Sequence, residues 1–321
     1  MTNDYTIPTT ISPQAQEALK EFSLEGDTIP APDDLDSWKK LWQEKEESKK
    51  EDNAKVVDHY KPVIEERKLD GVPVLDIKPK NWQDNGKVLV YTHGGGYVLF
   101  SAASTLISSV PVADTTKLRV VSVNYTVAPF AKWDEVTDQV IQVIKELITE
   151  GYNLNNIAIY GDSAGGGLAA GTVLKMRDYG LGMPATVVLW SPWSDITETG
   201  DTYATLKNHD PIILKSYSLT NIANAYADPA DQKNPYVSPV YGDYSKGFPP
   251  TLIQVGTKEI FLSNSVRHYQ ALDQANILVK LDPYEGMWHV FQEINWELPE
   301  SELARQKMAV FLAEHLNYKY Y

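Results

Sequence analysis

The sequence contains no cysteine, which excludes disulfide bonds, zinc–thiolate sites and thiol nucleophiles. It also lacks any apolar run that approaches the ~20 residues needed to span a bilayer. Its first residues, Met1–Thr6, show neither the basic start nor the apolar stretch of a secretory signal. From these absences we expect a soluble, cytoplasmic protein that does not enter a membrane.

Basic residues are scarce: 29 lysines and arginines stand against 43 aspartates and glutamates, which gives a formal net charge of -14. Such a chain repels nucleic-acid phosphates and anionic membrane surfaces, whereas small neutral or cationic ligands remain compatible with it. The six histidines show no paired spacing that is typical of metal sites. We therefore expect no nucleic-acid partner, no metal and no cofactor.

The first 60 residues are highly charged and have a helical pattern. Between Asp33 and Glu51 a helical face carries Leu35, Trp38, Leu41 and Trp42 among lysines and glutamates. One interpretation is an amphipathic helix that lies on the core. The other is that these aromatic side chains roof a substrate pocket.

From about residue 70 onward, short apolar, β-branched runs alternate with helical patterns, of which Trp133–Glu150 is the clearest. This alternation predicts an α/β fold with a mostly parallel central sheet flanked by helices. The expected strands are Val72–Ile77, Lys87–Thr92, Arg119–Asn124, Ile157–Tyr160, Thr186–Trp190, Thr251–Val255 and Val279–Tyr284.

One long interval, residues 195–250, contains no convincing core strand and shows a helical pattern only from Ile212 to Ala227. A long insertion on such a scaffold often covers the active site. We therefore expect one domain, residues 1–321, with a helical cap built from about 1–60 and 195–245.

The strongest motif is Gly161–Gly165, which reads Gly-Asp-Ser-Ala-Gly and lies between an expected strand and a helix of small residues. It fits the Gly-x-Ser-x-Gly turn, in which glycines leave room for a strained serine. This motif predicts that Ser163 is a nucleophile. The helix that follows directs its free N–H groups, including that of Ala164, at developing negative charge.

A second motif, His93–Gly96, directly follows an apolar strand. Its three glycines allow the backbone to approach a ligand and to offer N–H groups to an oxyanion. The donors are expected among Gly94, Gly95 and Gly96, together with Ala164.

A serine nucleophile needs an imidazole base and an acid that orients it. In this type of fold the acid follows the serine and the base comes last. His289 lies just beyond the last expected strand, and Glu259 is the only carboxylate in the segment that follows Thr251–Val255. We therefore expect a triad of Ser163, Glu259 and His289, with His268 and His315 on the surface.

Together these motifs resemble the bacterial hormone-sensitive lipase-like esterases, often called family IV. The chain differs by carrying Phe130 where the family commonly has an acidic residue, and Glu259 where it often has an aspartate. The resemblance rests on His93–Tyr97, Val123–Tyr125, Ala128–Pro129, Gly161–Gly166, Ser191–Trp193, Pro249–Thr251 and Gly286–Phe291.

The resemblance implies a capped α/β-hydrolase fold and hydrolysis of short-chain acyl or aryl esters through an acyl-enzyme. It also implies a homodimer, which the edge strand Val279–Tyr284 favours as well. Tyr97, Trp193 and Trp288 are candidate substrate contacts, although core packing explains each equally well. A lactonase, amidase or carbohydrate-ester deacetylase would use the same groups, and a non-catalytic small-molecule receptor on this fold is the remaining alternative.

Overall fold

A computed structural model describes residues 6–22, 28–207, 209–213 and 218–320. Its centre is an eight-stranded sheet with the order β1-β2-β4-β3-β5-β6-β7-β8. Only β2 runs opposite to its neighbours, and all other adjacent pairs from β4 to β8 are parallel. The strands are β1 Val63–Leu69, β2 Val72–Lys78, β3 Val88–Thr92, β4 Arg119–Val123, β5 Ile157–Asp162, β6 Thr186–Trp190, β7 Thr251–Gly256 and β8 Val279–Tyr284.

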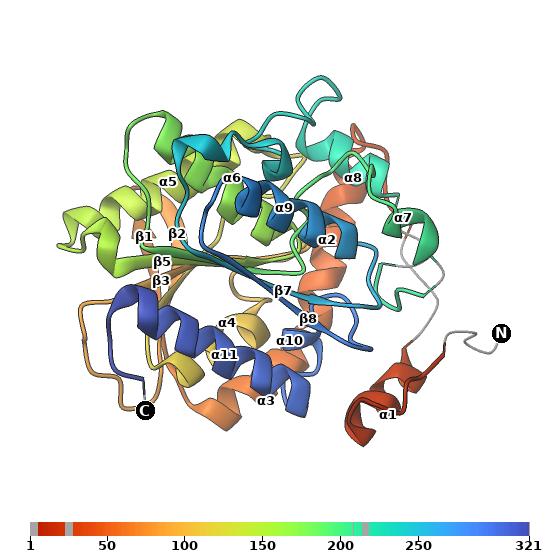
Figure 1. Cartoon of the computed structure of the whole chain (residues 1–321), viewed down its shortest axis with the longest axis horizontal. Coiled ribbons are helices and arrows are strands. Elements are labelled where there is room, and N and C mark those ends of the chain that lie inside the picture. The colour runs from red at the N-terminus through yellow and green to blue at the C-terminus, as the bar shows by residue number, and fades with distance from the viewer. Residues whose placement is uncertain (1–5, 23–27, 208, 214–217, 321) are drawn as a thin grey trace.

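Helices cover both faces of this sheet. Figure 1 shows α5, α6 and α9 on one face and α3, α4 and α11 on the other. The helices are α1 Pro13–Glu21, α2 Leu35–Ser48, α3 Lys50–Tyr60, α4 Leu106–Thr116, α5 Trp133–Thr149, α6 Ala164–Asp178, α7 Thr202–Thr205, α8 Leu219–Tyr226, α9 Leu262–Gln274, α10 Phe291–Ile294 and α11 Pro299–Leu316, with 3₁₀ turns at Leu154–Asn156, Pro239–Tyr241 and Tyr244–Lys246.

The five central strands, β3 to β7, are buried along their whole length. Their β-branched and apolar side chains meet helices on both faces, which is the environment that produces continuous apolar runs in a parallel sheet. The predicted α/β class and all seven predicted strands are confirmed. The expected edge position of β8 is confirmed as well.

Two helical expectations need correction. The pattern from Ile212 to Ala227 predicted one helix, but α8 begins only at Leu219. Ile212 and Ile213 instead follow a turn in which Asp210 Oδ1 accepts their backbone N–H groups, and residues 214–217 lie outside the described residues. His268 was expected on the surface but is fully buried in α9.

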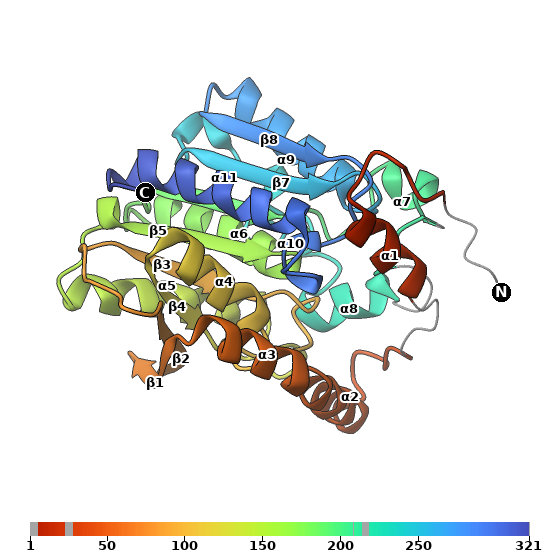
Figure 2. The same cartoon turned by 90° about the horizontal axis from the view of Figure 1, so that it is seen from below.

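The amphipathic helix predicted near the N-terminus is α2. Trp38 and Leu41 are buried as expected, whereas Leu35 is 51% exposed. Figures 1 and 2 show α2, α7 and α8 together at one end of the sheet. Segments far apart in the sequence thus meet at the end of the sheet where β5 leads into Ser163.

Candidate active site

Ser163 lies in a sharp turn between β5 and α6. Its backbone has φ 52° and ψ −123°, a conformation that is costly for any residue with a side chain. The turn is held in place because the Ser163 N–H donates to Trp190 O at 2.8 Å and the Ser163 carbonyl accepts from Trp193 N at 2.8 Å. The end of β6 and the segment that follows it therefore hold the strained serine through both its N–H and its carbonyl group.

The two glycines of this turn are required by packing. A Cβ added to Gly161 would overlap the Gly165 carbonyl, and one added to Gly165 would overlap the backbone of Thr92 and His93. Each contact involves backbone atoms that cannot rotate away. The expectation that side chains at these positions would clash is therefore confirmed.

The structure brings together the three residues that the sequence predicted as a triad. His289 Nε2 lies 2.9 Å from Ser163 Oγ, and His289 Nδ1 lies 2.7 Å from Glu259 Oε2. All three side chains are buried. Phe261 packs edge-on against the His289 ring, with ring centroids 5.0 Å apart, so the imidazole is held by packing as well as by hydrogen bonds.

Glu259 lies in the turn after β7, and His289 lies in the loop after β8. The second Glu259 oxygen, Oε1, accepts from Ser191 Oγ and from Gly256 N, both at 2.7 Å. Burial raises the pKa of Glu259, while His289 and the Ser191 hydrogen bond act in the opposite direction. These donors favour the ionised carboxylate in a site from which water is largely excluded.

Gly94 differs from the other glycines of its motif because its N–H donates to Asp162 Oδ1 at 3.1 Å. Gly95 and Gly96 line the cavity in front of Ser163 and both have positive φ, 99° and 64°. In the described part of the chain, no protein acceptor is recorded for the N–H groups of Gly95, Gly96 and Ala164. The N–H of Gly94 is thus engaged within the protein, unlike the three others as far as the described residues show.

Asp162 therefore links β3, the glycine loop and the nucleophile turn. Its Oδ1 also accepts from Tyr91 OH at 2.6 Å. Burial raises the pKa of Asp162 to about 6, and the Tyr91 and Gly94 hydrogen bonds counteract this effect. The side chain orders the loop that carries Gly95 and Gly96.

His93 contacts the same loop. Its Nδ1 lies 2.8 Å from the Gly94 carbonyl, and its ring stacks on Tyr125 at 4.1 Å between centroids. The Tyr125 hydroxyl in turn donates to the His93 carbonyl at 2.7 Å. Burial lowers the pKa of His93 to about 4, so this histidine is neutral at pH 7.

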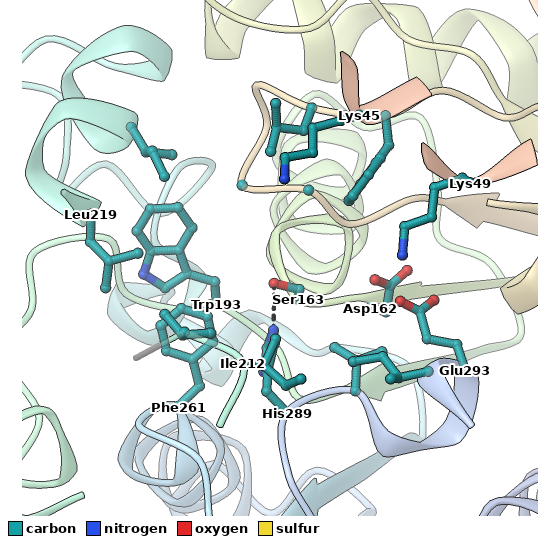
Figure 3. A pocket seen from close by; sticks show the side chains of 18 of the residues that line it. Lys45, Lys49, Asp162, Ser163, Trp193, Ile212, Leu219, Phe261, His289 and Glu293 are labelled. Carbon is teal, nitrogen blue, oxygen red and sulfur yellow. Dashed lines mark hydrogen bonds between the residues drawn. The ribbon is translucent and has the colours of Figure 1, made fainter. Parts of the chain in front are cut away.

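A cavity of about 330 Å³ opens in front of Ser163. Figure 3 shows Trp193, Phe261 and Leu219 on one side of the serine, and Lys49, Asp162 and Glu293 on the other. Its lining comprises Lys45, Ser48, Lys49, Gly95, Gly96, Leu99, Phe100, Asp162, Ser163, Trp193, Ile212, Ile213, Leu219, Ile222, Phe261, His289, Val290, Glu293 and Ile294.

Of the three aromatic residues predicted to contact substrate, only Trp193 lines this cavity. Tyr97 is buried behind the wall, where it stacks on Tyr226 with centroids 3.7 Å apart. Trp288 is fully buried and packs against Phe22 from the N-terminal segment. Both aromatic side chains belong to the core, so the structure corrects this part of the prediction.

Ser191, Phe261 and Glu293 were not identified as functional from the sequence. The position of Ser191 could have identified it as a candidate. It directly follows β6 at the carboxyl edge of the sheet, where active sites of this kind are built. Glu293 is four residues beyond His289, in a segment that the sequence marked only for its histidine. Their contacts depend on distant segments, so local pattern alone did not reveal them.

In the described ranges, no helix is long and apolar enough to cross a membrane. Over the same residues, no cluster of three or more histidine, aspartate or glutamate side chains is arranged to hold a metal ion.

Comparison with known proteins identifies the family to which this chain is related. Residues 89–293 match the model of a family with the α/β-hydrolase fold. An esterase from Acinetobacter venetianus is 32% identical over 70% of this chain and 74% of its own length. The chain belongs to the hormone-sensitive lipase-like esterases of the α/β-hydrolase fold family. As a member of that family, this α/β hydrolase is a carboxylic ester hydrolase.

Further relatives agree with this assignment. An acetyl-hydrolase from Streptomyces hygroscopicus is 31% identical to the α/β hydrolase over 72% of this chain and 76% of that protein. A crystal structure of an esterase from the bacterial hormone-sensitive lipase family shares 30% identity and a TM-score of 0.76, covering 79% of this chain and 85% of that one. Another esterase structure reaches a TM-score of 0.88 at 27% identity and covers 96% of both chains.

Proposed function

We propose that this α/β hydrolase cleaves short-chain acyl or aryl esters with Ser163 as nucleophile, His289 as base and Glu259 as the orienting acid. The observation that carries the proposal is the continuous contact from Ser163 Oγ through His289 to Glu259, with distances of 2.9 and 2.7 Å. A serine hydroxyl is barely ionised at neutral pH, so it needs a base at this distance.

In the first step His289 Nε2 takes the Ser163 proton while Oγ attacks the ester carbonyl carbon. The carbonyl oxygen becomes an oxyanion, which the N–H groups of Gly95, Gly96 and Ala164 stabilise. Loss of one such donor typically costs about 10²–10³ in rate. Glu259 holds the imidazole in the required tautomer and stabilises its protonated form.

The tetrahedral intermediate then collapses, and the C–O bond to the alcohol breaks. His289 gives its proton to the departing alcohol oxygen, leaving an acyl group on Ser163. In the second step a water molecule loses a proton to His289 and attacks the acyl carbon. Ser163 recovers that proton as the carboxylic acid leaves, so the enzyme returns to its starting state.

We further propose that residues 1–60 and 195–245 act as the cap over this site. This is supported by the cavity lining, which includes Lys45 of α2, Lys49 directly after α2, and Leu219 and Ile222 of α8. A cavity closed by such segments favours compact substrates over long acyl chains.

Two other activities use the same scaffold. A non-catalytic receptor needs no activated serine, and the complete hydrogen-bonded triad argues against it. A lactonase, amidase or carbohydrate-ester deacetylase would use the same triad, and only substrate assays separate it from the esterase.

A serine-directed phosphonate probe tests the proposal. Because it reacts with activated serines, it should label the wild-type protein and fail to label Ser163→Ala, which should also lose ester turnover by several orders of magnitude. Ser48→Ala is a matched control, since Ser48 lines the same cavity and its hydroxyl only donates to Lys45 O. Turnover by Ser163→Ala near the wild-type level would remove Ser163 from the mechanism.

Homodimer formation through β8 is a separate proposal. It is supported by the edge position of this strand, because an unpaired edge strand invites pairing with another chain. Light scattering should give twice the monomer mass of 36.0 kDa. A monomer mass across a wide range of protein concentration would contradict the proposal.

A further inference from the structure

Ile260 directly follows Glu259 in sequence and is held by the insertion between β6 and β7. The Ile260 N–H donates to Asp210 Oδ2 at 3.0 Å, and its carbonyl accepts from Thr202 Oγ1 at 2.6 Å. Ile260, Asp210 and Thr202 are all buried. Side chains that lie 50 and 58 positions earlier in the chain thus hold both peptide groups of the residue after the proposed triad acid.

These contacts act on the backbone of Glu259. The Ile260 N–H belongs to the same planar peptide unit as the Glu259 carbonyl, so a shift of one moves the other. On the opposite side of Glu259, the Lys258 N–H donates to Met287 O at 2.9 Å, which attaches the turn to the loop of His289. The backbone around Glu259 is therefore fixed on one side by the histidine loop and on the other by the insertion.

The second oxygen of Asp210 orders the wall of the cavity. Asp210 Oδ1 accepts from the N–H groups of Ile212 and Ile213, at 2.9 and 3.0 Å. Both isoleucines line the cavity in front of Ser163, and Figure 3 labels Ile212 there. One buried carboxylate therefore contacts both the turn that carries the triad acid and the segment that forms part of the cavity wall.

The chemistry of Asp210 suits it to this task. Hydrogen bonds to an ionised carboxylate are about twice as strong as those between neutral groups, and Asp210 accepts three from backbone N–H groups. Its complete burial keeps competing water away. Pro211 follows, and its ring restricts its own φ and the backbone of Asp210. Asp210 is therefore a rigid connection between the cavity wall and the triad.

We propose that Asp210 and Thr202 are positioning residues of the triad. Through the two peptide groups of Ile260 they hold Glu259 where its carboxylate meets the imidazole. The insertion thus forms part of the cavity wall and also completes the catalytic machinery, although neither residue touches the substrate. This inference rests on the ester hydrolysis proposed above, and it adds two residues to that reaction.

Asp210→Asn separates the two contacts of this side chain. The amide oxygen still accepts from Ile212 and Ile213, whereas the amide NH₂ cannot accept from the Ile260 N–H. With p-nitrophenyl butyrate as substrate, kcat per active site should fall about 10- to 100-fold, because a small displacement of a catalytic group costs up to about 100-fold. KM should stay nearly unchanged, since the cavity wall is retained. The phosphonate probe titrates the active sites, so loss of folded enzyme does not affect this value.

Thr202→Val tests the same peptide without a change of charge. The charges of Asp210 and His289 attract each other, so Asp210→Asn alters the electrostatics of the site as well as the position of Ile260. Thr202→Val removes a neutral hydroxyl and should lower kcat per active site about tenfold. Thr202→Ser keeps the hydroxyl and should retain the wild-type kcat. This pair of variants decides the outcome if Asp210→Asn does not fold.

A double variant shows whether Asp210 acts through Glu259. Glu259→Gln alone should lower turnover by ~10⁴. Adding Asp210→Asn to it should cause little further loss, because residues that act as a unit have non-additive effects. Independent effects would instead multiply, and a double variant that is slower by the product of the two single effects would overturn the proposal.

Asp195→Asn is the matched control. Asp195 is another buried carboxylate of the insertion and accepts the N–H of Thr197 at 2.9 Å, but its ion pair is with Arg267. Its kcat per active site should equal that of the wild type, and a fall as large as that of Asp210→Asn would overturn the proposal.

The wild-type kcat in both Asp210→Asn and Thr202→Val would overturn it as well. A wild-type protein that neither reacts with the phosphonate probe nor hydrolyses p-nitrophenyl butyrate would instead refute the function proposed at Ser163. The failure of the positioning role and the failure of the proposed function are therefore distinguishable.

Discussion

Ser191 and Glu259 are joined by a hydrogen bond of 2.7 Å from the serine hydroxyl to Oε1 of the glutamate. The same hydroxyl oxygen accepts from Val290 N at 3.1 Å. Ser191 thus connects the end of β6 with the carboxylate after β7 and with the loop that holds His289. One hydroxyl positions two of the three elements that make up the triad.

Ser191→Ala should therefore lower kcat about tenfold while leaving KM nearly unchanged, since a hydrogen bond to a charged group is worth roughly 1.5–3 kcal/mol. The Glu259 carboxylate would lose a donor and the His289 loop an acceptor. Steady-state kinetics on a short-chain ester measures the effect. A purely structural role for Ser191 would instead reduce the amount of folded enzyme and leave kcat per active site, titrated with the phosphonate probe, at the wild-type value.

Glu259→Gln keeps the shape of the side chain and removes its charge. Turnover should fall by ~10⁴, because the imidazole then adopts the wrong tautomer and its protonated form is not stabilised. Parallel kinetics on Asp273→Asn and Asp282→Asn serve as controls for other carboxylates near β8. High activity of Glu259→Gln, together with loss of activity in either control, would assign the acid elsewhere.

Replacement of Asn264 distinguishes a structural role of this residue from a catalytic one. Its Oδ1 accepts from Asp195 N at 2.7 Å and its Nδ2 donates to Tyr203 OH at 2.9 Å, all inside the protein. Asn264→Ala should change turnover per folded molecule only slightly but lower the free energy of unfolding by about 1–3 kcal/mol, because a buried N–H loses its acceptor. Urea denaturation alongside kinetics separates the two effects. A large loss of kcat with unchanged stability would contradict this prediction.

The burial of His268 predicts how the free energy of unfolding depends on pH. It is fully buried between Ser194 Oγ and Tyr244 OH, and burial lowers its pKa from 6.5 to about 3. Below pH 6.5 His268 therefore binds a proton in the unfolded chain but not in the folded protein. The contribution of neutral His268 to the free energy of unfolding is fully present above pH 6.5. It is lost progressively as the pH falls toward 3.

Urea denaturation at pH 7 and pH 4 measures this loss. At about 1.4 kcal/mol per pKa unit, His268 should contribute about 3 kcal/mol of destabilisation by pH 4. His268→Gln should start from a lower stability at pH 7 and lose about that much less on acidification. Parallel stability curves for the two proteins would show that His268 titrates normally in the folded state.

The cavity also predicts the acyl-chain preference. Turnover of p-nitrophenyl esters should be highest for chains of roughly two to eight carbons and fall for longer ones, because a space closed by the proposed cap segments limits what enters. Strong preference for emulsified long-chain triglycerides would contradict this and indicate a lipase.

The strands that the sequence predicted correctly are those whose pattern depends on local burial and side-chain type. Central strands such as β3 and β5 are recognisable because burial on both faces demands continuous apolar runs. The strand β1 was missed because most of its residues are partly or fully exposed and several are charged, and only pairing with β2 makes it a strand. Its existence is a tertiary property that the local sequence does not encode.

The same distinction applies to the site. Ser163 was predictable because the glycines around it are required by a turn of a few residues. The hydrogen bond of Gly94 to Asp162 was not, since it joins segments 68 residues apart. Nor did the pattern distinguish Trp193, which lines the cavity, from Tyr97 and Trp288, which fill the core, because all three are aromatic residues within sequence motifs.

The backbone of Ser163 is strained, with φ 52°. Catalytic activity and conformational stability therefore make opposite demands on this position. Holding a residue with a Cβ in this region costs on the order of 1–3 kcal/mol, and glycine would relieve much of that cost. A screen for thermostable variants that omits an activity assay would therefore reward Ser163→Gly, which relieves the strain and, under the proposed mechanism, removes the nucleophile. Heat tolerance and turnover are opposing traits at this one position, so directed evolution of this hydrolase must select for both at once.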